Sequence, residues 1–78
     1  MKHIQEMAML TRISQKQFLR DVEKARDLWK INTWPKGKEV FATIDGYDCY
    51  CVCRSERIME ETYQAVLKRA EQLETQEG

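Results

Sequence analysis

The sequence predicts a small α+β domain in which an antiparallel hairpin packs on helices. Two runs rich in β-branched and aromatic residues, at about 38–45 and 46–54, meet at Asp45-Gly46, the strongest short-range signal for a type I′ turn. Apolar residues at helical spacing before and after these runs indicate helices at about 3–12, 14–31 and 56–74. The predicted order is therefore α-α-β-β-α in a single domain, residues 1–78, with frayed ends at 1–2 and 75–78.

The two-residue loop fixes the register of the hairpin, because paired residues of antiparallel strands share a face. One face then carries Val40, Ala42, Ile44, Tyr47, Cys49, Cys51 and Cys53. The other face carries Glu39, Phe41, Thr43, Asp48, Tyr50 and Val52. A shift by one residue would divide the apolar set between the faces, so we expect the cysteine face to be the core face.

All three cysteines occupy alternate positions of the second run, at Cys49, Cys51 and Cys53. Free cysteine behaves as a small hydrophobe, which favours three compact core residues and no cofactor. A metal site is the weaker alternative, since zinc usually takes four ligands and only the distant His3 or a second subunit could complete the set. The odd thiol count, with no signal-peptide pattern, predicts a reducing compartment, the cytoplasm.

The helix expected at 14–31 begins with a capping-box pattern formed by Ser14 and Gln17, which also suggests a break from the preceding helix near residues 12–14. Its expected buried stripe is Phe18, Val22, Ala25 and Trp29. Pro35 and Gly37 end it. Trp34, between helix and hairpin, is expected either to cover the open end of the core or to anchor a partner.

The last helix has a plausible N-cap at Ser55 and a regular apolar seam. The seam residues, at spacings of four and three, are Met59, Tyr63, Val66, Ala70 and Leu73. Two heptads are short for an independent coiled coil, so we expect the seam to pack within its own fold rather than against a partner helix.

The net charge of zero conceals an asymmetry. Residues 1–38 hold nine Lys or Arg against four Asp or Glu, a net +5, and residues 39–78 hold four against nine, a net −5. Such asymmetry is typical of a surface that binds nucleic acid or an acidic partner. No apolar run approaches the roughly 18 residues that a membrane span needs.

Several of the cations recur at helical spacing and predict a basic ridge for nucleic acid or an acidic partner. The ridge residues are Arg12, Lys16, Arg20 and Lys24, with Lys36 and Lys38 at the mouth of the hairpin. The order helix, helix, hairpin also resembles a winged helix at the level of the fold. Against DNA or RNA, acidic residues intersperse the ridge, the hairpin tip carries Asp45 and Asp48, and the pI is about 6.6.

The chain carries no phosphate-binding loop, nucleophile elbow or paired histidines, so we expect no enzyme. The first hypothesis is a non-catalytic protein-interaction module, such as the small regulators and inhibitors that phages and mobile elements encode. Its expected partner-binding residues are Phe41, Tyr50, Val52 and Trp34. Nucleic-acid binding through the ridge is the alternative, and a homodimer through an edge strand or the outer face stays open.

Overall fold

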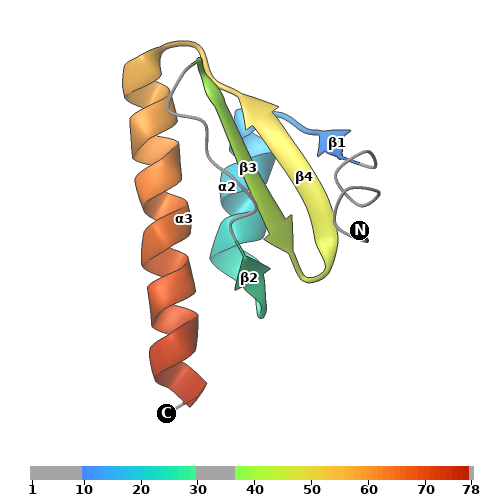
Figure 1. Cartoon of the computed structure of the whole chain (residues 1–78), viewed down its shortest axis with the longest axis vertical. Coiled ribbons are helices and arrows are strands. Elements are labelled where there is room, and N and C mark those ends of the chain that lie inside the picture. The colour runs from blue at the N-terminus through green and yellow to red at the C-terminus, as the bar shows by residue number, and fades with distance from the viewer. Residues whose placement is uncertain (1–9, 30–36, 78) are drawn as a thin grey trace, which may run out of the picture.

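A computed structural model describes residues 10–29 and 37–77 (Figure 1). The elements in this part of the chain are β1 (Thr11–Arg12), α2 (Gln15–Lys24), β2 (Leu28–Trp29), β3 (Glu39–Ile44), β4 (Tyr47–Val52) and α3 (Glu56–Glu77). The α+β class is confirmed, with two described helices and a four-stranded mixed sheet. Neither helix combines the length and apolar character that a membrane crossing demands.

The hairpin of β3 and β4 has the predicted register. Asp45 and Gly46 both adopt positive φ, 52° and 82°, as a type I′ turn requires. Ile44 pairs with Tyr47 and Ala42 with Cys49, and the ladder continues to Glu39 and Val52. The strands are slightly shorter than the predicted 38–45 and 46–54, although the Cys53 N–H still donates to the Lys38 carbonyl at 2.7 Å.

The expected two-stranded sheet is wrong, because a short strand flanks the hairpin on each side. β1 runs parallel to β4, with Thr11 beside Cys49 and Arg12 beside Tyr50. β2 runs antiparallel to β3, which gives the sheet order β1-β4-β3-β2. The predicted helix at 3–12 is therefore wrong for residues 11–12, which extend because the backbone pairs with β4, and residues 3–9 lie outside the described part of the chain.

Helix α2 begins as predicted but ends seven residues early, at Lys24 instead of 31. The Ser14 hydroxyl accepts the Gln17 N–H at 3.1 Å, which confirms the cap and the break before it. At the other end, the N–H groups of Arg26 and Asp27 donate to the Asp45 carboxylate, each at 2.9 Å. These long-range bonds satisfy N–H groups that would otherwise continue the helix, and the chain extends into β2.

Both helices pack on the cysteine face of the sheet, and the core lies between the helices and this face. In Figure 1, α2 lies behind the hairpin and α3 beside it. The buried hydrophobic residues are Phe18, Val22, Ala25, Leu28, Val40, Ala42, Ile44, Cys49, Cys51, Cys53, Met59 and Val66. The predicted seam of α3 packs within this core. Tyr47 shares the face by register, but at the hairpin tip it is 53% exposed.

The end of α3 also differs from the expectation, since the helix continues from the predicted residue 74 to Glu77. The Thr75 hydroxyl donates to the Glu71 carbonyl at 2.7 Å, which occupies one carbonyl in the last turn. The sequence has no glycine or proline in α3 that would end it sooner.

Candidate interaction surface

The outer face of the sheet, opposite the helices, centres on an aromatic pair. Phe41 and Tyr50 lie directly across β3 and β4, with their ring centroids 5.3 Å apart and the ring planes 21° from parallel. Both rings and Val52 are only half-buried, and the strand alternation that turns their neighbours into the core turns these three outwards. The structure therefore brings together three of the four residues that the sequence predicts for partner binding. Trp34 lies outside the described residues.

Two further residues belong to this outer face and were not predicted for it. Trp29 was expected on the buried stripe of a helix, but it lies on β2 opposite Thr43 and is 66% exposed. Arg12 was expected on a helical ridge, but it lies on β1 beside Tyr50. Their positions depend on pairing between distant segments, so only the β propensity of each short segment could have suggested them.

The polar groups on the outer face are in part already paired with one another. The Thr43 hydroxyl donates to the Asp48 carboxylate at 2.7 Å, directly across the hairpin. The Trp29 indole N–H donates to the Asp27 carboxylate at 3.1 Å, which fixes the ring near the sheet edge. Because these groups already have partners, covering them leaves fewer unsatisfied polar atoms than covering solvated groups would.

The predicted basic ridge is divided between elements. Lys16, Arg20 and Lys24 are exposed along α2 at the expected spacing. Arg12 lies on β1, and exposed Lys38 precedes β3. Lys36 lies outside the described residues. The structure thus assembles a ridge of three cations on one helix.

The three thiols lie in the core, and burial raises the pKa of two of them. Burial, aided by the carboxylates of Asp21 and Asp48, raises the pKa of Cys49 to about 11. Burial, with the neighbouring thiols, raises the pKa of Cys51 to about 12. A thiol is a nucleophile and a metal ligand as the thiolate, so both groups are held in their unreactive form. Within residues 10–29 and 37–77, no three His, Cys, Asp or Glu side chains converge as a metal site.

These raised pKa values predict a loss of stability at alkaline pH. The unfolded chain releases thiol protons from about pH 9, whereas the native protein keeps them until about pH 11 for Cys49 and 12 for Cys51. The unfolding free energy should therefore fall between pH 9 and 11, by at most about 1.4 kcal/mol per pH unit for each thiol. Urea titrations at several pH values measure the slope. Cys51→Ala should make the fall of the unfolding free energy with pH shallower. An unchanged slope would contradict the assignment of this pH dependence to the buried thiols.

Comparison with known proteins gives no further guide: no family model, curated protein or solved structure matches the chain. The case for a function therefore rests on the surfaces that the described residues form.

Proposed function

We propose that this protein is a non-catalytic protein-interaction module, a small regulator or inhibitor that binds its partner through the outer face of the sheet. The observation that carries this proposal is the stacked pair of Phe41 and Tyr50 on the face opposite both described helices. Aromatic side chains that lie on a rigid, hydrogen-bonded sheet supply large contact areas at a low entropic cost.

The composition of the outer face supports a protein partner. Aromatic residues and arginine are enriched among the anchors that dominate binding energy, and this face combines three aromatic rings with Arg12. Its carboxylates, Glu39 and Asp48, outnumber its one arginine. That balance disfavours the phosphate backbone of a nucleic acid on this face.

Nucleic-acid binding is the second candidate, and the exposed ridge of Lys16, Arg20 and Lys24 on α2 favours it. These three cations, spaced four residues apart, form one line of charge along the helix. The ridge predicted from the sequence had six cations. Retention of a labelled oligonucleotide at low salt, lost in the variant Lys16→Glu with Arg20→Glu, would select this candidate.

The proposal is tested by replacing both rings with threonine, Phe41→Thr and Tyr50→Thr, because threonine is a β-branched residue that strands favour. Proteins retained from a lysate by the tagged wild-type chain are identified, purified and titrated against both chains. We expect the double variant to bind the purified partner at least about 30-fold more weakly, since an interface anchor contributes about 2 kcal/mol or more.

A matched control is Leu67→Thr, a half-buried apolar residue on α3. The control should bind the partner as the wild type does. Equal affinity of the wild type and the Phe41 and Tyr50 variant for every purified partner would reject the outer face as the binding surface.

A further inference from the structure

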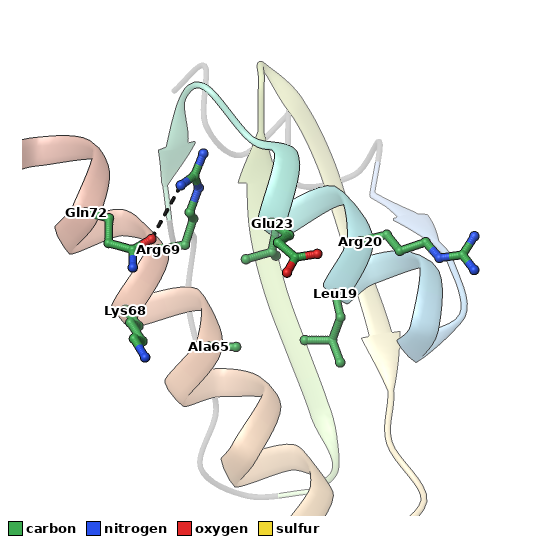
Figure 2. Close-up of a pocket in the computed structure, with 8 residues that line it drawn as sticks. Leu19, Arg20, Glu23, Ala65, Lys68, Arg69 and Gln72 are labelled. Carbon is green, nitrogen blue, oxygen red and sulfur yellow. Dashed lines mark hydrogen bonds between the residues drawn. The ribbon is translucent and has the colours of Figure 1, made fainter. Parts of the chain in front are cut away.

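A second candidate surface lies between the two helices, where the structure leaves a groove of about 420 Å³ (Figure 2). Two hydrogen bonds join α2 to α3. Near the start of α2 the Gln15 side-chain amide donates to the Thr62 hydroxyl at 3.1 Å, and just past its end the Arg69 guanidinium donates to the Ala25 carbonyl at 2.8 Å. Between these bonds α3 lines the groove with Ala65 and Lys68, and the side chain of Ala65 is too small to fill the space.

The groove combines an apolar floor with a mainly cationic border. Its apolar lining residues are Leu19, Val22 and Ala65. Its charged lining residues are Arg20, Lys68, Arg69 and Glu23. Because the Arg20 guanidinium points away from the groove, the charges at its border are those of Lys68 and Arg69 against the one carboxylate of Glu23. Figure 2 shows Ala65 pointing into the space between the helices, while the Arg20 guanidinium points away from α3 along the outer side of α2.

Among the described residues, the cations of the groove have no carboxylate partner. The ion pair in this part of the chain joins Arg57 to Glu61, outside the groove. The Arg69 guanidinium is held in place by the Ala25 carbonyl and, at 3.4 Å, by the Gln72 side-chain oxygen. It is thus oriented by neutral acceptors, and its Nε atom is buried with no hydrogen-bond partner among the described residues. The positive charge at this end of the groove is therefore held in position by neutral acceptors, without an ion-pair partner among the described residues.

We infer that this groove binds an acidic amphipathic helix of another protein, a surface and partner chemistry beyond the outer-face proposal. Apolar side chains of such a helix would cover Leu19 and Ala65, and its carboxylates would lie toward Lys68 and Arg69. The charge excess of the border favours an acidic segment. The apolar floor favours a peptide over a nucleic acid, because phosphates gain nothing from apolar contact.

The probe is a fluorescein-labelled helical peptide with leucine at i, i+3, i+4 and i+7 and glutamate beside them, and its counterpart has lysine in place of glutamate. Fluorescence polarisation should show binding of the glutamate peptide at low salt and at least about tenfold weaker binding of the lysine peptide. Lys68→Glu should weaken the binding of the glutamate peptide by about tenfold or more. Ala65→Trp should do the same because it fills the groove without changing the charge.

The controls separate this inference from the outer-face proposal. Lys38→Glu makes the same charge change away from the groove and should leave the peptide affinity unchanged, as should the Phe41 and Tyr50 double variant. Circular dichroism shows whether each variant is folded, and Lys68→Glu, at an exposed position, keeps the test decisive if Ala65→Trp does not fold.

Three results would overturn the inference. One is equal affinity for both peptides, and another is unchanged affinity in folded Lys68→Glu. The third is binding of another ligand to the same groove. A labelled oligonucleotide, or a second copy of the chain detected by sedimentation, would then bind more weakly to the Lys68 and Ala65 variants, while the glutamate peptide would bind all variants equally.

Discussion

Phe18→Ala should lower the free energy of unfolding by about 3–5 kcal/mol, because it truncates a large, fully buried core residue. The Phe18 ring is 0% exposed and packs from α2 into the core shared by the sheet and α3. Small domains have unfolding free energies of roughly 5–15 kcal/mol in total, so this loss is a large fraction of the stability. Urea denaturation followed by circular dichroism measures the change.

The neighbouring variant Leu19→Ala is the control for Phe18→Ala. It shortens a side chain on the same helix that is only half-buried at the groove, so its cost should be clearly smaller. If Leu19→Ala cost as much as Phe18→Ala, the orientation of α2 on the sheet would be wrong.

The second large effect is expected for Asp45→Ala, at about 2–5 kcal/mol. Alanine at φ 52° costs about 1–2 kcal/mol, since its Cβ crowds the backbone in the left-handed region. The substitution also removes the acceptor of the Arg26 and Asp27 N–H groups, and each such bond contributes about 0.5–1.5 kcal/mol. The unfolding free energy from urea titration is again the measured quantity.

Asp45→Asn is the matched control for both causes together, because asparagine tolerates positive φ and keeps one side-chain oxygen as an acceptor. We expect the asparagine variant to retain most of the stability that the alanine variant loses. An asparagine variant as unstable as the alanine variant would show that neither the turn conformation nor the two hydrogen bonds stabilises the fold.

The hairpin could be predicted from the sequence because its signals are local. Asp45-Gly46 specifies the turn, and alternation of the flanking residues specifies which side chains enter the core. The same locality explains why Phe41, Tyr50 and Val52 were correctly grouped on one face.

The short strands and the end of α2 could not be predicted, because contacts between distant segments decide them. The spacing of Phe18, Val22, Ala25 and Trp29 indicates a helix through residue 29. The structure instead favours extended backbone after Lys24, because the Asp45 carboxylate accepts the next two free N–H groups and Arg69 donates to the Ala25 carbonyl. Two residues of β2 then turn Trp29 onto the outer face. The groove was missed for a related reason, since Leu19 and Ala65 are brought together only by helix packing.

The central claim is that the sheet has one core face and one face available to a partner, and it can be tested without knowing that partner. The measurement is the free energy of unfolding of Phe41→Thr with Tyr50→Thr. A stacked aromatic pair contributes about 0.5–1.5 kcal/mol beyond its buried area, so we predict a loss of about 1–2 kcal/mol and a cooperative transition. A loss as large as that of Phe18→Ala would place the two rings in the core and contradict the account.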